Sequence, residues 1–445
     1  MTTLRFYQGL CTIGGTVVEI AAEGARCLFD FGIEGSTEMD RRVYLRPSHM
    51  VSDLLKTGGL PPVPGLYGRA DLGDNPLAAF GEMQPRPFVL ISHMHIDHMG
   101  ALGALCDQAD VYMTEESLCL YQGLAKTGDI FFRPHLQVIG VKPLEWISRG
   151  SLRFRAIPVD HDVPGACGFE IETPDGRVLY TGDLRIHGFR GEDTMRFASL
   201  AAGADILITE GVTTSFIEDF NSVVPGCDLS SAKTERSTVQ DITSAAVAAK
   251  GIVFLNVYNR NLDRLEALLK SLNEAGRQLV LEPETVLLLR HCRNLDRLFI
   301  YQPLVKPGDQ IEAEGVTREE LQSHPEKYVL QLSYEHLLES LDFAPETSLY
   351  IHANGVPLGA YDPSYQRLSD FLARQGIPYL NIGSGGHAAP EHLKYILETI
   401  APKYLIPLHS LTPEKIRIDG SRQVLPKAGE SYRLKNGELL PDDVA

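Results

Sequence analysis

The segment from Ser92 to Gly100, SHMHIDHMG, constrains the fold of this chain more than any other stretch. It follows the apolar run Phe88-Val89-Leu90-Ile91, which predicts a buried strand, and a helix-forming stretch begins at Gly100. Four of the six residues from His93 to His98 can bind a metal ion. We therefore predict a metal site on a strand-to-helix turn.

The spacing within this segment predicts two ligand sets. His93 and His95 are two residues apart, so in extended geometry their rings project to the same side, where one ion can bind both. Asp97 and His98 are adjacent where the chain turns, so they point elsewhere and suit a second ion. A lone histidine is more often a surface or core residue, but clustered His and Asp behind an apolar strand favour metal binding.

Composition limits the class of protein. The 445 residues are 44% hydrophobic and 22% charged, which is typical of two or three globular domains. No signal segment or membrane-spanning apolar run is found, and the seven cysteines are scattered and never form C-x-x-C. We therefore expect a cytoplasmic protein without membrane contact.

The formal net charge of −17 argues against duplex nucleic-acid binding over the whole surface, because nonspecific phosphate binding depends on Lys and Arg. A local site is still compatible with this charge. Two divalent ions and a few arginines can reverse the field within one cleft.

Further polar residues follow predicted strands along the chain. They are Asp30, His161, Asp183, Glu210 and His409. Asp183 comes after a hairpin that turns at Asp175-Gly176, and a carboxylate at a strand end can bridge two cations. Taken alone, each of these residues could have a purely structural role. Together with the histidine-rich segment, however, they favour metal binding.

A glycine-rich loop, Ser384-Gly385-Gly386-His387, lies between a predicted strand at 379–382 and a helix with Pro390 in its first turn. The amides of such a loop form an anion nest, so Ser384 and His387 are candidate phosphate-binding residues. We expect the chain to re-enter its core at this strand.

Residues between Glu210 and this loop alternate strands with helices. A predicted capping box at 237–240 opens a helix, and the strands at 251–255 and 278–281 flank a leucine stripe, so a parallel sheet is expected. Asn259, Arg260 and Asn261 follow a strand where such sheets expose ligand-binding loops.

Two other segments have open interpretations. The cluster Arg290, Arg293 and Arg297 either contacts phosphates or forms a solvated helix face, and we favour the second. Residues 33–86 form a loosely patterned excursion, which either shapes access to the site or covers an edge.

These motifs resemble, in order, those of the β-CASP nucleases of the metallo-β-lactamase fold, the group of ribonuclease J and the pre-mRNA 3′-end cleavage factors. The resemblance implies an α/β fold, with an αββα sandwich built from residues 1–213 and 381–445. It also implies an inserted β-CASP α/β domain with a parallel sheet at 214–380. Thr234-Glu235-Arg236 is similar to the Ser-Glu-Arg that opens this insertion in ribonuclease J relatives.

The resemblance also implies a role for each candidate residue. One ion is held by His93, His95 and His161, a second by Asp97, His98 and His409, and Asp183 bridges them. The catalytic set is Asp97, His387 and Glu210, with Glu210 orienting His387; Asp30 supports the metal loop; and Ser384, Gly385, Gly386 and His387 bind the substrate phosphate. Zinc fits the ligands, and Mn²⁺ is the alternative.

The implied activity is hydrolysis of single-stranded RNA by two-metal activation of water. His409 favours RNA, because the DNA-repair branch of the family tends to have an apolar residue there. The alternatives are a single-stranded DNA nuclease, a small-molecule phosphodiesterase or thioesterase, and a non-catalytic subunit of a processing complex.

Two departures from the ribonuclease J pattern leave further points open. Ile351–Pro357 stands in place of a serine-rich phosphate pocket, so both exonuclease and endonuclease activity are compatible with the sequence. Ribonuclease J relatives carry a further C-terminal domain, whereas this sequence stops at Ala445, so the oligomeric state, a homo-oligomer included, is not implied.

Overall fold

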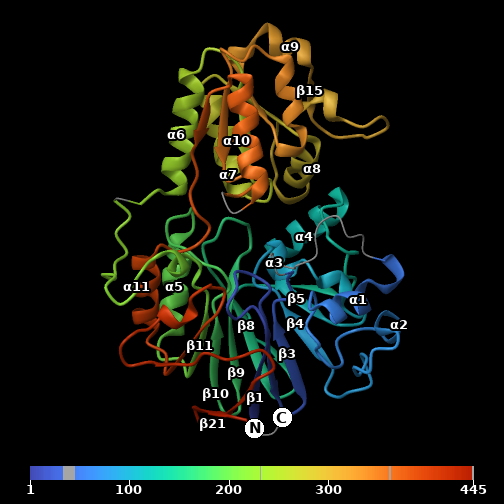
Figure 1. Ribbon diagram of the computed structural model, residues 1–445, viewed down its shortest axis with the longest axis vertical. Helices are drawn as coiled ribbons and strands as arrows, with labels where there is room; N and C mark the ends of the chain where they lie inside the picture. The colour runs from blue at the N-terminus through green and yellow to red at the C-terminus, as the bar shows by residue number, and fades with distance from the viewer. Residues whose placement is uncertain (34–45, 231, 360–361, 443–445) are drawn as a thin grey trace.

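The computed structural model describes residues 1–33, 46–230, 232–359 and 362–442. Two bodies are stacked along the long axis of the molecule, as Figure 1 shows. The lower body holds two sheets and both chain termini, and the upper body holds a third sheet.

The lower body contains an eight-stranded and a seven-stranded sheet. The first has the order β22 (Glu438–Pro441), β21 (Ser431–Lys435), β1 (Thr2–Gln8), β2 (Val17–Ala22), β3 (Ala25–Phe29), β4 (Pro87–Leu90), β5 (Val111–Thr114) and β6 (Val138–Val141). The second has the order β20 (Arg422–Gln423), β19 (Tyr404–Pro407), β11 (Ile206–Thr209), β10 (Gly176–Tyr180), β9 (Cys167–Thr173), β8 (Leu152–Pro158) and β7 (Ile147–Arg149).

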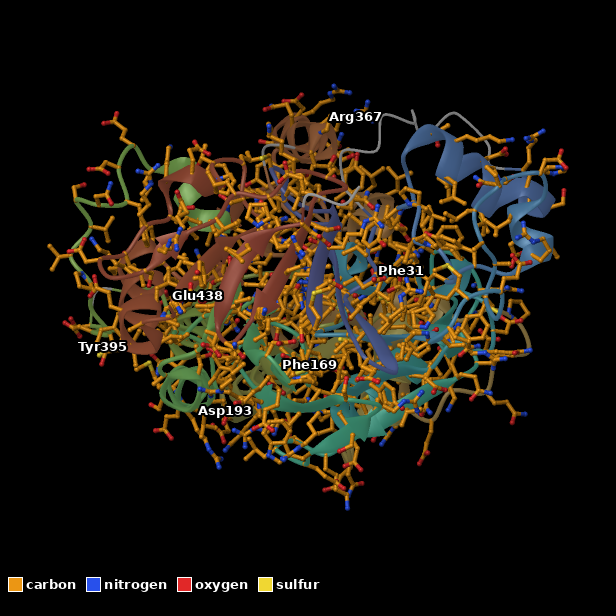
Figure 2. All side chains as sticks on the ribbon, turned by 90° about the horizontal axis from the view of Figure 1, so that it is seen from below. Phe31, Phe169, Asp193, Arg367, Tyr395 and Glu438 are labelled. Carbon is orange, nitrogen blue, oxygen red and sulfur yellow. The ribbon has the colours of Figure 1, made fainter. Side chains whose placement is uncertain are left out.

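The two sheets pack face to face through side chains that alternate along each strand. Phe29 and Leu90 of the first sheet belong to the same buried cluster as Phe169 and Tyr180 of the second, and the Phe29 and Tyr180 rings stack at 4.8 Å between centroids. Figure 2 views this body from below, with Phe169 in its interior. The inner faces of the two sheets therefore form one core.

Helices cover the two outer faces, so the body has four layers. On the first sheet, Leu28 and Val89 pack with Leu120 of α4 (Glu115–Thr127). On the second sheet, Leu207 packs with Phe197 of α5 (Gly191–Ala201) and with α11 (Pro390–Ile400). Together with the third sheet, this confirms the predicted αββα sandwich with an added α/β unit.

The third sheet is entirely parallel. Its order is β15 (Glu314–Val316), β14 (Phe299–Tyr301), β13 (Gln278–Leu281), β16 (Tyr328–Gln331), β12 (Val253–Val257), β17 (Leu349–Ala353) and β18 (Tyr379–Asn381). Its helices are α6 (Glu235–Ala248), α7 (Leu262–Glu274), α8 (Pro283–Cys292), α9 (Arg318–Ser323) and α10 (Pro363–Gln375). The predicted division at residues 213 and 380 stays a proposal, and its second boundary falls within β18.

Two local predictions in this region are wrong. The helix expected from a capping box at 237–240 begins three residues earlier, because Thr234 is the N-cap and its Oγ1 accepts a hydrogen bond from Ser237 N at 3.1 Å. The strand at 379–381 does not re-enter the core, because β18 pairs in parallel with β17 of the third sheet. The return to the core begins after this strand, in the glycine-rich loop.

The described part of the excursion, Ile33 and residues 46–86, contains α1 (Met50–Thr57) and α2 (Arg69–Leu72); residues 34–45 lie outside the described ranges. Leu60, Leu66 and Tyr67 are buried in the cluster on the outer face of the first sheet. This part of the chain therefore covers a sheet face. Across the described ranges, no helix combines the length and the apolar character needed to cross a membrane.

One edge of the sandwich collects the strand ends that matter for function. β3 and β4 are parallel neighbours, as are β10, β11 and β19, and β8 runs in the same direction as β10 because both are antiparallel to β9. The residues that follow these strands therefore meet at one edge, where α/β sheets place their ligand sites.

Candidate metal centre

Asp30 fixes the loop that carries the histidine-rich segment. It follows β3 with a positive φ of 54° and is fully buried. Its carboxylate accepts hydrogen bonds from Ser92 N at 2.7 Å, Ser92 Oγ at 2.8 Å and Tyr180 Oη at 2.5 Å. It also lies 2.8 Å from His98 Nδ1, so the other nitrogen of this ring faces away from Asp30.

A first group of side chains is formed by His93, His95, His161 and Asp183, whose ligand atoms all lie within 4.8 Å of one another. His95 Nδ1 lies 3.1 Å from both His93 Nε2 and His161 Nε2. Asp183 Oδ2 lies 3.6 Å from His93 Nε2 and 3.9 Å from His161 Nε2. The short helix α3 (Ile96–Met99) begins directly after His95.

A second group is formed by Asp97, His98 and His409. Asp97 Oδ2 lies 3.6 Å from His98 Nε2 and 3.8 Å from His409 Nε2. Asp183 Oδ2 lies 3.3 Å and 3.5 Å from the same two nitrogens, so one carboxylate borders both groups. Gly14 N donates to His409 Nδ1 at 3.0 Å, which fixes the orientation of that ring.

The residues present fit divalent cations. His98 Nε2, His409 Nε2 and Asp183 Oδ1 are buried and have no hydrogen-bond partner among the described residues. Such a buried group costs about 1–3 kcal/mol unless something binds it. Burial lowers the pKa of His161 to about 3 and that of His93 well below its ordinary value, so both rings keep a free lone pair at neutral pH.

His387 forms a third candidate group with Asp183 and His409, and it is held by Glu210. Its Nδ1 lies 3.2 Å from Glu210 Oε1 and 3.7 Å from Asp183 Oδ2. Glu210 also accepts hydrogen bonds from Leu184 N at 3.2 Å and Val212 N at 3.1 Å. Although burial opposes it, the carboxylates of Glu210 and Asp183 raise the pKa of His387 to about 9.

The glycine-rich loop is held by its carbonyl groups. Gly385 O accepts from Arg185 Nη1 at 2.7 Å, and Gly386 O lies 2.6 Å from His161 Nδ1. The amides of Gly385, Gly386 and His387 make no hydrogen bond to any other described residue. Ser384 Oγ is likewise buried without a partner among those residues, while Ser384 N donates to Asn354.

Sequence reasoning missed two features of this centre. Asp162 Oδ1 lies 3.1 Å from His95 Nε2 and 3.4 Å from His161 Nε2, and its place directly after His161 is the only sequence signal for it. Arg185 is 1% exposed and connects the loop to the inserted sheet through Glu235, with Nη1 3.0 Å from Oε1. The only sequence signal for Arg185 is its position two residues after Asp183.

Residues that were expected in exposed ligand loops are buried. Arg260 is 6% exposed and donates to Met94 O at 2.7 Å, and Asn261 is 2% exposed and caps α7 through its side chain. Of the arginines in and after α8, Arg290 donates to backbone carbonyls, and the other two pair with carboxylates of the chain. Arg293 binds Asp263 at 2.8 Å, and Arg297 binds Glu314.

Comparison with known proteins agrees with this architecture. Residues 60–219 match the family described as the beta-lactamase superfamily domain. Across nearly its whole length the chain resembles a crystal structure titled as a protein of unknown function from Enterococcus faecalis V583. The TM-score is 0.83 and the identity 29%, over 97% of this chain and 99% of that one.

Curated relatives include ribonuclease J of Sinorhizobium meliloti, 21% identical over 89% of this chain and 70% of that protein. Ribonuclease J of Thermus thermophilus is 22% identical over 72% and 57%, and ribonuclease J2 of Bacillus subtilis is 22% identical over 79% and 64%. The chain thus spans about 57–70% of the length of these relatives.

Fold and site define the class of this protein, the metallo-β-lactamase superfamily of metal-dependent hydrolases. The relatives narrow the class further. Within that class the curated relatives are ribonucleases J, so the chain is similar to the β-CASP nucleases.

Proposed function

We propose that this protein hydrolyses phosphodiester bonds in single-stranded RNA with two divalent metal ions. One observation carries the proposal: seven side chains that can bind metal converge at one sheet edge, next to a histidine held by a carboxylate. The names of the homologues support RNA as the substrate class.

In this proposal His93, His95 and His161 would hold the first ion, Asp97, His98 and His409 would hold the second, and Asp183 would serve both. Neutral imidazoles with carboxylates favour zinc, and manganese is the alternative. When bound, such a pair of ions lowers the pKa of a water molecule and stabilises the charge that develops on the phosphate.

The chain's own residues would supply the remaining chemistry. Glu210 contacts Nδ1 of His387 and favours the protonated ring, so Nε2 can give a proton to the leaving oxygen. The unpaired amides of Gly385 and Gly386 would bind the phosphate oxygens. Because the carbonyls of these glycines are already held, the amides are oriented before the substrate arrives.

Charge favours a single strand bound locally. The net charge is −17, and Arg293 and Arg297 already form ion pairs with carboxylates of the chain. A long duplex would therefore meet repulsion over much of the surface, whereas one strand entering the metal centre would not. We place this reaction in the cytoplasm, because all seven cysteines are free.

The test is cleavage of labelled RNA by the purified full chain, with 5′-phosphorylated RNA, 5′-hydroxyl RNA and single-stranded DNA compared side by side. We expect RNA to be cut, and EDTA or the Asp183→Ala substitution to abolish cutting. Intact RNA together with rapid hydrolysis of a thioester or a small phosphodiester would overturn the proposal in favour of a small-molecule hydrolase.

A further inference from the structure

A cavity of about 140 Å³ lies directly beside the metal-binding loop. Ile96, Met99 and Gly100 line it from one face of α3, as expected for residues three and four apart in a helix. Ile96 lies between His95 and Asp97 in the chain, and consecutive Cα atoms are about 3.8 Å apart. The cavity therefore borders the loop that carries His95 and Asp97, and Arg260 in its lining donates to Met94 O of that loop at 2.7 Å.

The size and the walls of the cavity suit one flat apolar ring. A cavity of about 150 Å³ lined by Leu, Ile and Phe is known to hold benzene. Here Leu102, Tyr121 and Ile130 join Ile96 in the lining. A single six-membered ring therefore fits this space.

The mouth of the cavity exposes an aromatic side chain. Phe131 is 52% exposed and Ile96 is 47% exposed, which is unusual for large apolar side chains beside a polar centre. Phe132 packs edge-on against Phe131, with 4.8 Å between ring centroids and an interplanar angle of 81°, and so restricts its movement. An exposed, restrained ring is the feature on which single-stranded nucleic-acid binders stack bases.

Asp129 and Arg260 form a polar wall of the cavity, and the Asp129 carboxylate can accept a hydrogen bond from a ligand. Asp129 Oδ2 binds Arg260 Nη2 at 2.9 Å, and Arg260 is held further by Met94 O. Asp129 Oδ1 accepts no hydrogen bond from the rest of the described chain, and the side chain is 46% exposed. An ionised carboxylate accepts from an amino group such as N4 of cytosine, but repels the O4 carbonyl that uracil presents at the same position.

We propose that this cavity binds the pyrimidine base of a nucleotide adjacent to the bond that is cut, with cytosine preferred to uracil. The inference rests on the proposed function for its substrate class. Phe131 stacks on the base, the apolar wall excludes water, and Asp129 selects the amino group. The ribose then spans the distance between this cavity and the metal centre.

The first test measures binding to the metal-loaded full chain by calorimetry with three probes: cytidine 5′-monophosphate, uridine 5′-monophosphate and ribose 5-phosphate. The cytidine nucleotide should bind about tenfold more tightly than the uridine nucleotide, as for one selective base contact. Ribose 5-phosphate should bind most weakly. Equal affinity for ribose 5-phosphate and the cytidine nucleotide would overturn the proposal.

Two variants separate stacking from selection. Phe131→Ala should weaken both nucleotides about fivefold or more and leave ribose 5-phosphate unchanged. Asp129→Asn should erase the preference for cytosine, because an amide donates as well as accepts. Since Asp129 also supports Arg260, metal content is measured in both variants; unchanged cytidine binding in Phe131→Ala contradicts the inference whatever Asp129→Asn does.

A second test distinguishes this inference from the proposed function. RNA strands that differ only in one nucleotide beside the cut site carry cytidine, uridine or an abasic ribose. Fast cutting at cytidine and slow cutting at the abasic site support the inference. Equal rates on all three contradict the inference alone, and no cutting of any strand contradicts the proposed function, leaving the binding measurements to decide on the cavity.

Discussion

The metal centre and the junction with the inserted sheet both gather polar groups at strand and helix ends, but they treat these groups differently. At the metal centre, His98 Nε2 and His409 Nε2 are buried without partners among the described residues. At the junction, Arg264 binds Glu235 at 2.7 Å and Asn354 at 2.9 Å, so the buried charges satisfy one another. The gathering of unpartnered imidazole and carboxylate atoms at the candidate metal centre thus fits bound cations, whereas the paired groups at the junction hold structure.

The strongest test of this difference is Asp183→Ala. Removing the carboxylate that borders both groups leaves two clusters of imidazoles without the shared anion. We expect loss of bound metal, measured by elemental analysis, and a fall in RNA cleavage of at least about 10³-fold. Asp309→Ala, at an exposed position of the upper body, is the control and should change neither quantity. Full metal content in Asp183→Ala would break the comparison.

His387→Ala sharpens the boundary of the metal centre. Its ring contacts Glu210 as well as Asp183, and with Asp183 and His409 it forms a group that could hold a metal; we propose that it is a proton donor and not a ligand. We expect metal content to stay at the wild-type level while turnover falls by about 10²–10⁴-fold. If the variant is purified without one of its ions, His387 belongs to the ligand set.

The junction is tested by Arg264→Met. The substitution keeps the volume but leaves Glu235, which is fully buried, with Arg185 as its remaining cation. Breaking such a pair should lower the free energy of unfolding by about 3 kcal/mol, measured by urea denaturation. The matched control is Arg297→Met, whose exposed pair with Glu314 should contribute less than about 1 kcal/mol. Equal effects of the two substitutions would show that burial does not matter here.

The smallest expected effect is a pH dependence of stability. Burial, with Arg185 nearby, lowers the pKa of His187 to about 4, and its Nε2 lies 3.0 Å from Gly385 O. The unfolded chain binds this proton near pH 6.5, so stability is full above that pH and falls as the pH decreases toward 4.

At pH 5 the loss attributable to His187 should be on the order of 2 kcal/mol relative to pH 7. Unfolding curves of wild type and His187→Gln at both pH values measure it. The variant should show a smaller pH dependence; an identical dependence would assign the acid sensitivity to other groups.

The candidate metal centre could be predicted from the sequence because its information is local, and its ligand roles stay predictions. A histidine-rich segment behind an apolar strand, and single polar residues after other strands, can be read from short stretches, and parallel strands bring such ends to one edge. Asp162 was missed because its neighbour His161 accounted for the motif. Its contact with His95 joins two loops that are distant in the sequence. His95 and His161, the neighbour of Asp162, are 66 residues apart.

Pairing between distant segments was not predictable in the same way. Residues 379–381 form a strand in both the prediction and the structure. The local sequence does not determine whether this strand pairs with β17 or with a strand of the lower body. The start of α6 was misplaced because Thr234 and Ser237 are both good N-cap residues three positions apart. Arg185, Glu235 and Arg264 meet only once three segments have folded together.

The two candidate ligand groups draw on positions from His93 to His409. During synthesis, a ribosome-bound chain shorter than 409 residues lacks one of the seven side chains, although most of both bodies has already emerged. Under the proposed activity, the nascent polypeptide has no complete second ligand group, and so does not cut the messenger that encodes it, before residue 409 has been added. Order along the chain would in this way act as a built-in delay on a potentially self-destructive reaction.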